Sequence, residues 1–135
     1  MNKKKYLVTG GLGFIGSHLV EKLIKKNFSV IVVDDLSSGK KENLANLSRN
    51  KNLKILIKKI QDTDDKIFKN ICGIYHLAAQ TSVQKSVERP YYSSSNNIMS
   101  SIKVFEIAKK YNIPIVYASS SAVYGNLKLG DDSKD

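Results

Sequence analysis

The sequence predicts an α/β fold built on a doubly wound parallel sheet that stops after about five strands. Three observations predict it. Short β-rich runs alternate with helical segments, the runs are apolar on both faces, and glycines cluster where the first run meets the first helix. Runs that are apolar throughout are typical of strands buried in a parallel sheet. Alternating strands and helices join such strands through right-handed crossovers.

Five runs are predicted to be strands. They are rich in β-branched and aromatic residues and are bounded by Gly, Pro, Asn or charged residues. They cover residues 6–9, 29–33, 53–57, 74–77 and 113–118.

Two amphipathic helices are predicted between these strands. Residues 14–26 place apolar side chains on one helical stripe and mostly charged side chains opposite. Residues 90–111 begin with a proline suited to a first helical turn and end before Asn112 and Pro114, which stop a helix. Weaker helices are expected over residues 41–47 and 63–70.

Composition bounds the class of protein. A length of 135 residues suits one domain, and 41% hydrophobic residues suit a soluble globular chain. We expect a domain over residues 1–125 and a polar tail over residues 126–135. No apolar run is long enough to cross a bilayer and no apolar signal core follows the basic N-terminus, so we expect no membrane partner and a cytoplasmic location. The single Cys72 and the two histidines argue against a disulfide framework and a structural zinc site, and no metal is expected.

The charge of the chain is strongly basic. It carries 22 basic and 12 acidic residues, a formal net charge of +10. The basic residues are nearly all lysines scattered along the chain, whereas base recognition favours arginine. We therefore expect no nucleic-acid partner, and we interpret the charge as a solvated exterior that also attracts an anionic small ligand.

A glycine-rich turn, TGGLGFIGSH, joins the first predicted strand to the first helix. Gly10 permits the tight turn, Gly13 lets a phosphate approach the backbone, and Gly16 lets helix and sheet pack closely. The helix N-terminus then offers unpaired N–H groups and the positive end of the helix dipole to an anion.

Asp34 lies 24 residues after Gly10, at the end of the second predicted strand. A carboxylate there can accept hydrogen bonds from the adenosine ribose hydroxyls, and it repels a 2′-phosphate. The strand, turn, helix and acid together are typical of a Rossmann domain and predict NAD rather than NADP. The competing interpretation is a glycine-rich turn that binds nothing, with Asp34 as an ordinary turn residue.

Four segments resemble one enzyme family in their order and spacing. They are TGGLGFIGSHL, DDLSSGKKENL, HLAAQTSVQKSVERP with the NN that follows it, and SSSAVYG. By these segments the chain is identified as a member of the extended short-chain dehydrogenase/reductase family, the NAD-dependent nucleotide-sugar epimerases and dehydratases. Within the family it is most similar to the enzymes that invert C4 of UDP-glucose and UDP-N-acetylglucosamine.

The resemblance implies NAD as the cofactor and a set of residues around it. Phe14 and Ile15 would give backbone N–H groups to the pyrophosphate, residues 34–39 would surround the adenosine ribose, and residues 77–81 would lie beneath the cofactor and run toward the nicotinamide. Asn96 or Asn97 would enter the site from the long helix, and the alternative for Asn97 is a solvent-facing position. The implied cofactor-binding residues are Gly10, Gly13, Phe14, Ile15, Gly16, Asp34, Asp35, Leu36, Ser37, Ser38, Gly39, Ile60, Leu77, Ala78, Ala79, Gln80, Thr81, Asn96 and Asn97.

The resemblance implies Ser120 as a catalytic residue, four residues before the tyrosine of VYG. Its hydroxyl would hydrogen-bond the reacting 4-oxygen of the sugar and help a catalytic tyrosine to deprotonate it. Ser119 or Ser121 would take this role if the register slips by one residue, and all three serines could be turn formers. His76 is interpreted as a core histidine rather than a catalytic one.

The catalytic base is where the chain departs from the family pattern. The family uses a Tyr-x-x-x-Lys pair, which one helical turn places on the same face. Tyr124 and Lys128 match this spacing, but Gly125 and Asn126 between them are turn residues. We interpret the match as a coincidence and expect the true pair, with the sugar-binding part, beyond Asp135.

A second departure concerns the adenine. The family has an aspartate after the third strand that accepts from the adenine amino group, and Lys59 stands at this place, with Ile60 beside it. A lysine cannot accept a hydrogen bond. Adenine is then held less tightly, or the register slips and Asp62 takes the role.

The resemblance implies an isomerase of carbohydrate metabolism that acts on a UDP-hexose at C4 by reversible hydride transfer to NAD. We expect the full-length enzyme to be a homodimer and the 135-residue chain by itself to be inactive. The first alternative is a nucleotide-sugar 4,6-dehydratase, but those enzymes resemble S-T-D-E-V-Y-G, with acidic residues where this chain has Ser121 and Ala122. The second alternative is an NAD-binding remnant without catalysis.

Overall fold

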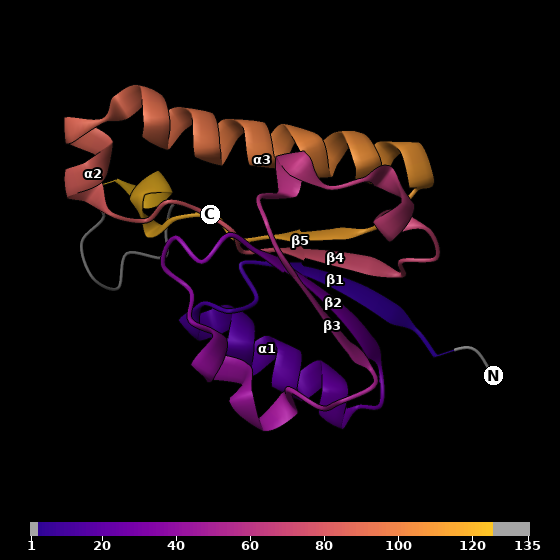
Figure 1. Cartoon of the computed structure of the whole chain (residues 1–135). Coiled ribbons are helices and arrows are strands. Elements are labelled where there is room, and N and C mark those ends of the chain that lie inside the picture. The colour runs from indigo at the N-terminus through magenta and orange to yellow at the C-terminus, as the bar shows by residue number, and fades with distance from the viewer. Residues whose placement is uncertain (1–2, 126–135) are drawn as a thin grey trace.

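One sheet of five parallel strands organises the chain, and the computed structural model describes residues 3–125 (Figure 1). Its strands are β1 (Lys5–Thr9), β2 (Ser29–Asp34), β3 (Leu53–Ile57), β4 (Gly73–His76) and β5 (Ile115–Tyr117). They lie in the order β3-β2-β1-β4-β5, and every neighbouring pair is parallel. The predicted α/β fold with five parallel strands is confirmed.

Helices cover both faces of the sheet, as Figure 1 shows. On one face lie α1 (Phe14–Lys25) and the short 3-10 helix η1 (Lys41–Leu47). On the other face lies α3 (Pro90–Tyr111), together with the 3-10 helices η2 (Ile60–Asp62) and η3 (Asp65–Phe68). The chain runs outward from β1 to β3, then returns to place β4 on the other side of β1. The topological switch point of the sheet is therefore between β1 and β4.

Each face of the sheet has its own apolar core, because successive residues of a strand point to opposite faces. In β1, Leu7 belongs to the core under α3 and Val8 belongs to the core under α1. Val104 of α3 and Val20 of α1 have no exposed surface and pack into these two cores. Burial on both faces explains why the central strands have continuous apolar sequences.

The two weaker helices expected from the sequence are not α-helices. Residues 41–47 form the 3-10 helix η1, which is kinked at Leu44, where φ is −123°. Leu44 is the buried residue of this segment, so the segment has no apolar stripe to stabilise an α-helix. Of residues 63–70, the helical ones are those of η3, which spans only four residues.

A short helix was missed by the sequence analysis. α2 (Val83–Glu88) precedes α3 and begins after Ser82, whose hydroxyl accepts from the backbone N–H of Lys85. None of its residues is buried. Because it has no buried apolar face, its sequence carries no periodic pattern that would predict a helix.

The fifth strand is shorter and more exposed than predicted. Residues 113–118 were expected to form a buried strand, but β5 has three residues and, among the strands of residues 3–125, pairs with β4 alone. Val116 is 57% exposed and Tyr117 is 51% exposed. Ile113 instead follows the C-cap of α3, where its N–H donates to the Ala108 carbonyl and its side chain is buried.

In the described part of the chain, no helix has both the length and the apolar character needed to cross a membrane. The predicted polar tail, residues 126–135, lies outside the described residues, and so does Lys128.

Candidate functional site

Loops from several strands gather at one edge of the sheet. Because the strands are parallel, the segments that follow β1, β2 and β4 all leave from their carboxyl ends (Figure 1). In open α/β sheets this edge, at the switch point, is where ligands bind. The candidate site residues predicted from the sequence lie in these loops, in the loop after β3, at the start of α1, on the facing part of α3 and after β5.

The glycine-rich loop turns directly from β1 into α1. Gly10 has φ of +68°, a conformation that residues with a side chain rarely adopt, and its N–H donates to the Val33 carbonyl over 2.9 Å. Gly13 is the residue before the helix, where Ser17 donates its N–H to the Gly13 carbonyl over 3.0 Å. The N–H groups of the first helical turn have no partner within their own helix. The loop therefore presents a helix N-terminus with no side chain at Gly13.

The structure differs from the prediction in which glycine of this loop packs against the sheet. Gly16 was expected to let the helix and sheet close together, but a Cβ there would collide with the carbonyl of Gly10 and with Cα of Gly11. Gly16 thus lets the loop fold onto the helix. The close approach to the sheet is made by Gly11, where a Cβ would lie 2.7 Å from a methyl group of Val32.

Phe14 and Ile15 open α1 with their side chains in solvent, 80% and 68% exposed. Two large apolar side chains are normally buried in a first helical turn that packs on a core. Neither side chain joins the apolar cores on the two faces of the sheet, and the Phe14 ring lies 5.0 Å from the ring of His18. The prediction that they face an anion is consistent with this placement.

Asp34 ends β2 and joins three segments of the carboxyl edge. It is 7% exposed, and its Oδ2 accepts from the N–H of Leu12 and its Oδ1 from the N–H of Leu36, both over 2.9 Å. A Cβ added to Gly39 would lie 2.9 Å from Oδ1, so the chain passes directly beside the carboxylate. Each carboxylate oxygen has a second lone pair, and a pair of hydroxyls could use these.

Leu12 is a site residue that the sequence analysis did not single out. Its side chain is fully buried, and its carbonyl accepts from the backbone N–H of Lys40 over 3.0 Å and from Nδ2 of Asn43 over 2.7 Å. Because its N–H donates to Asp34, both backbone polar groups of Leu12 are hydrogen-bonded. No local pattern predicts these bonds, because their partners lie 22 to 31 residues away.

The segment after Asp34 forms a tight, exposed turn. Asp35 accepts from the N–H of Ser37 over 2.9 Å, and Leu36 has φ of +61°. Asp35, Ser37 and Ser38 are exposed, so their polar groups face solvent at the edge of the sheet. This is the placement that a ribose-binding turn requires, and it also satisfies an ordinary Asx turn.

The residues after β4 are held at two points. Leu77 and Ala78 donate their N–H groups to the hydroxyl of Thr9 over 3.2 and 3.1 Å. Gln80 forms a reciprocal pair with Asn97, which accepts from the N–H of Gln80 over 2.7 Å and donates to its carbonyl over 3.1 Å. Asn97 therefore faces this loop, and the alternative of a solvent-facing helix residue is wrong.

The remaining residues of this loop are more open to solvent. Ala79 and Thr81 are exposed, and the side chain of Gln80 accepts from the Ser93 hydroxyl over 2.7 Å. Ser93 is buried on α3, which makes it a second anchor that the sequence analysis missed.

Lys59 follows β3, at the place where the family has an aspartate. Its Nζ donates to Oδ1 of Asn96 over 2.9 Å and lies 5.7 Å from the ring centre of Tyr92. Ile60 beside it is 3% exposed, and Asp62 is exposed within η2. Asn96 thus accepts a hydrogen bond from a lysine, while Asn97 is hydrogen-bonded to the backbone of the loop after β4.

Ser120 lies after β5 in an exposed segment. Its hydroxyl accepts from the N–H of Ala122 over 3.2 Å and so begins the 3-10 helix η4 (Ser121–Tyr124). Ser119 and Ser121 are exposed as well. Tyr124 ends this turn, 66% exposed, and Gly125 follows with φ of +63°. A helix does not continue through such a glycine, which supports the interpretation that Tyr124 and Lys128 match the catalytic spacing by coincidence.

His76, at the end of β4, is 2% exposed, and burial lowers its pKa from 6.5 to about 4. Its ring is therefore neutral at physiological pH. The interpretation of His76 as a core histidine agrees with this burial.

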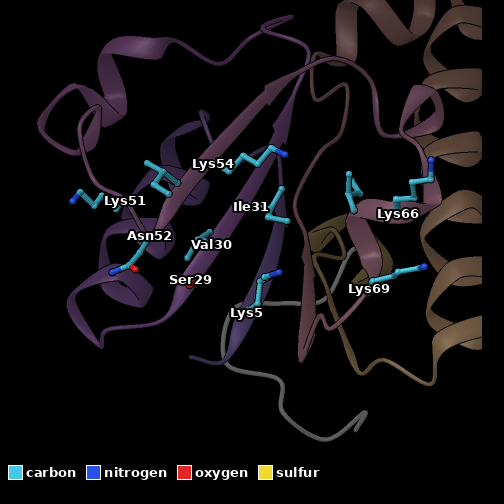
Figure 2. Close-up of a pocket in the computed structure, with 11 residues that line it drawn as sticks. Lys5, Ser29, Val30, Ile31, Lys51, Asn52, Lys54, Lys66 and Lys69 are labelled. Carbon is cyan, nitrogen blue, oxygen red and sulfur yellow. The ribbon is translucent and has the colours of Figure 1, made fainter. Parts of the chain in front are cut away.

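A pocket of about 400 Å³ lies at the opposite edge of the sheet (Figure 2). Lys5, Ser29 and Lys54 line it near the amino ends of β1, β2 and β3. Figure 2 shows the side chains of Lys51 and Lys66 extending away from each other, so the ammonium groups do not meet around one point. Within residues 3–125, no group of three or more His, Cys, Asp or Glu side chains is placed to hold a metal ion.

These loops on this sheet define a Rossmann-type α/β protein. A model of one enzyme family, described as GDP-mannose 4,6 dehydratase, matches residues 7–133 of the chain. The chain belongs to the NAD-dependent epimerase/dehydratase family.

Curated relatives include several UDP-sugar enzymes. A protein of Methanocaldococcus jannaschii, provisionally named UDP-glucose 4-epimerase, is 47% identical over 122 residues, which cover 88% of this chain and 39% of that protein. UDP-glucuronic acid decarboxylase 1 of Arabidopsis thaliana is 35% identical over 90% of this chain and 27% of its own length.

Solved structures of 4-epimerases share the fold. The UDP-N-acetylglucosamine 4-epimerase of Methanobrevibacter ruminantium, in complex with UDP-N-acetylmuramic acid, is 45% identical with a TM-score of 0.86, covering 96% of this chain and 44% of that one. The UDP-glucose 4-epimerase of Thermus thermophilus, in complex with NAD, is 34% identical with a TM-score of 0.80, covering 94% and 41%. The chain spans between about a quarter and somewhat under half of the length of these four relatives.

Proposed function

We propose that this chain is the NAD-binding part of a nucleotide-sugar 4-epimerase, whose substrate is a UDP-hexose inverted at C4. The observation that carries the proposal is the Asp34 carboxylate, which lies at the end of β2 and is bonded to Leu12 of the glycine-rich loop. This bond places one carboxylate beside one helix N-terminus. A dinucleotide site needs the carboxylate for the ribose and the helix N-terminus for the diphosphate. The similarity to UDP-sugar 4-epimerases supports the choice of reaction.

The residues present fit a dinucleotide. The first-turn N–H groups of α1, beside Gly13, would hold the diphosphate, because they are unpaired within the helix and lie at the positive end of its dipole. The oxygens of Asp34 would accept from the adenosine ribose hydroxyls. A second negative charge beside this carboxylate would be repelled, so the site selects NAD against NADP.

NAD, when bound, supplies a reversible hydride acceptor, and the chain aligns it with the sugar. Residues 77–81 would form the floor beneath it, held by Thr9 and Asn97. Ser120 would hydrogen-bond the 4-oxygen of the sugar and help a tyrosine base to remove the proton from that oxygen. We do not assign that base to Tyr124, because its turn ends at Gly125.

Calorimetry with NAD tests the proposal. We expect wild type to bind NAD and to bind NADP more weakly, and we expect Asp34→Ala to lose about tenfold or more in NAD affinity while its preference over NADP disappears. Asp64→Ala is the matched control, because this exposed acid also accepts from an N–H two residues further on, and Lys66 beside it lines the pocket at the opposite edge of the sheet. The absence of heat at millimolar NAD with folded wild type, or equal affinities of the two alanine variants, contradicts the proposal.

An NAD-binding remnant without catalysis is the second candidate, favoured by the exposed position of Ser120 in the turn that begins η4. The two candidates share NAD binding and differ in the sugar. Titration of the NAD-loaded chain with UDP-glucose separates them, because an epimerase part that contributes Ser120 to the sugar site gives a heat that Ser120→Ala reduces. No heat in either protein favours the remnant.

A further inference from the structure

The Thr9 hydroxyl lies among three polar groups at the carboxyl edge of the sheet. Thr9 ends β1 and has no exposed surface. Its Oγ1 lies 2.7 Å from Nδ1 of His76, 3.2 Å from the backbone N of Leu77 and 3.1 Å from the backbone N of Ala78. All three distances suit hydrogen bonds. The hydroxyl therefore has as many partners as it can take, namely two donors and one acceptor.

Donor and acceptor roles follow from the chemistry of these groups. The backbone N–H groups of Leu77 and Ala78 can only donate, so they occupy both lone pairs of the Thr9 oxygen. The hydroxyl hydrogen remains, and it must go to Nδ1 of His76. An accepting Nδ1 carries no proton, so the neutral ring has its proton on Nε2.

The other ring nitrogen leads to the same tautomer. Nε2 of His76 lies 3.3 Å from Oγ of Ser101. The Ser101 hydroxyl donates its one hydrogen to the Asn97 carbonyl over 2.8 Å, so its oxygen must accept from His76. Acceptance by Ser101 requires a proton on Nε2. The two sides of the ring thus agree, and both of its nitrogens have partners.

These bonds hold the segment after β4 against the glycine-rich loop. A Cβ added to Gly10 would lie 2.8 Å from the backbone N of Ala78, so the two loops touch there. On the far side of the ring, Ser101 belongs to the same stretch of α3 as Asn97, which binds the backbone of Gln80. His76 connects both attachments of this segment, one through Thr9 and one through α3.

We propose that His76 is a positioning residue of the cofactor site. As the Nε2–H tautomer it takes the hydroxyl hydrogen of Thr9, which keeps both lone pairs of that oxygen on Leu77 and Ala78 and fixes residues 77–81 beside Gly10. The proposal rests on the proposed function in one respect, namely that this segment borders the dinucleotide. The tautomer and the Ala78 hydrogen bond belong to the protein without cofactor, so they can be tested separately from NAD binding.

Nitrogen NMR of the histidine-labelled protein measures the tautomer directly. We expect His76 to show a protonated Nε2 and an unprotonated Nδ1. His18 is a built-in control, because its Nδ1 lies 2.8 Å from the Phe14 carbonyl, which can only accept. His18, when neutral and bonded in this way, carries its proton on Nδ1, the opposite tautomer. A protonated Nδ1 on His76 overturns the proposal.

Amide hydrogen exchange measures the bond that His76 is proposed to direct. Ala78 is the better reporter, because Leu77 also donates to the Thr9 carbonyl. We expect the Ala78 amide to exchange about tenfold faster in Thr9→Val, which keeps the shape but removes the hydroxyl, and in His76→Leu. Thr9→Ser and His76→Asn keep the hydroxyl and an acceptor near Nδ1, so Ala78 should stay protected in them. Unchanged exchange in Thr9→Val and His76→Leu overturns the proposal.

NAD affinity distinguishes positioning from a general loss of stability. We expect His76→Leu and Thr9→Val to weaken NAD binding about tenfold and His76→Asn to restore most of it. Val104→Ala is the control, because it opens a cavity in the core under α3 and should lower stability while leaving NAD affinity unchanged. Equal weakening by Val104→Ala and Thr9→Val overturns the positioning role. A wild type that shows the expected tautomer but binds no NAD contradicts the proposed function instead.

Discussion

Leu12 donates its backbone N–H to Oδ2 of Asp34 over 2.9 Å, which joins the glycine-rich loop to the end of the neighbouring strand. The other carboxylate oxygen accepts from Leu36 over the same distance. Two loops therefore depend on a single buried side chain for their relative position. This relationship makes Asp34 part of the fold as well as a candidate ribose ligand.

The first prediction concerns stability. Asp34→Ala leaves the N–H groups of Leu12 and Leu36 without their acceptor, and we expect the free energy of unfolding to fall by about 2 kcal/mol. Urea denaturation without cofactor measures it. Asp35→Ala should change stability by less than about 0.5 kcal/mol, since its one bond lies within an exposed turn. Equal stability of the two variants would show that the carboxylate does not hold the loops.

The second prediction separates two glycines of the loop. In Gly10→Ala the new methyl group meets the backbone of Ala78 at 2.8 Å and φ is +68°, so we expect a loss of at least about 2 kcal/mol in stability. In Gly13→Ala the nearest atom is the Gly10 carbonyl oxygen at 3.3 Å, and φ is −76°, so the protein should fold. The methyl group would lie where the diphosphate is proposed to approach, and calorimetry should show NAD affinity reduced about tenfold. A stable Gly10→Ala, or a Gly13→Ala that binds NAD like wild type, contradicts this division of roles.

Local sequence patterns predicted the elements that have strong periodicity or clear end signals. α1 was predicted to within one residue, and α3 with its observed bounds, because Pro90 begins it and Asn112, with φ of +51°, ends it. The Gly10 turn and the position of Asp34 at the end of β2 followed from the same kind of pattern. These features depend on residues close together in the chain.

Features that depend on distant partners could not be predicted in this way. Thr9 and His76 are 67 residues apart, and Asn97 reaches Gln80 across 17 residues. Nothing local to Asn97 distinguishes a loop-binding amide from a solvent-facing one. The HLAA segment did place a histidine at the end of a buried strand. The strand beside it, β1, ends with the hydroxyl of Thr9, and this is the signal in the sequence that indicates their contact.

The third prediction concerns Tyr124. It is 66% exposed at the end of a short turn that stops at Gly125, so we expect Tyr124→Phe to change stability by less than about 0.5 kcal/mol and NAD affinity not at all. We also expect no interconversion of UDP-glucose and UDP-galactose by the 135-residue chain in a coupled assay. Measured interconversion that is lost in Tyr124→Phe would identify Tyr124 as the base.

The fourth prediction is a loss of stability in mild acid that depends on His76. Burial lowers the pKa of His76 from 6.5 to about 4, so the unfolded chain takes up a proton at a pH where the folded chain resists it. Stability from this group is complete above pH 6.5 and falls as the pH drops toward about 4, by about 3 kcal/mol in all. The ring of Tyr117 lies 5.7 Å from that of His76. Denaturation midpoints measured against pH should fall in wild type and stay flatter in His76→Asn.

A second acid-sensitive group lies elsewhere and gives the fifth prediction. Hydrogen bonds from Lys110 and Lys103 on α3 lower the pKa of Asp65 in η3 from 3.8 to about 2. A carboxyl group whose pKa is lowered by folding stabilises the protein above pH 3.8, and this contribution disappears as the pH falls toward about 2. Asp65→Asn should therefore flatten the pH dependence only below about pH 4, where His76 no longer contributes a slope, and leave the decline at higher pH intact. If Asp65→Asn instead removed the decline between pH 6.5 and 4, the acid sensitivity in that range could not be assigned to His76.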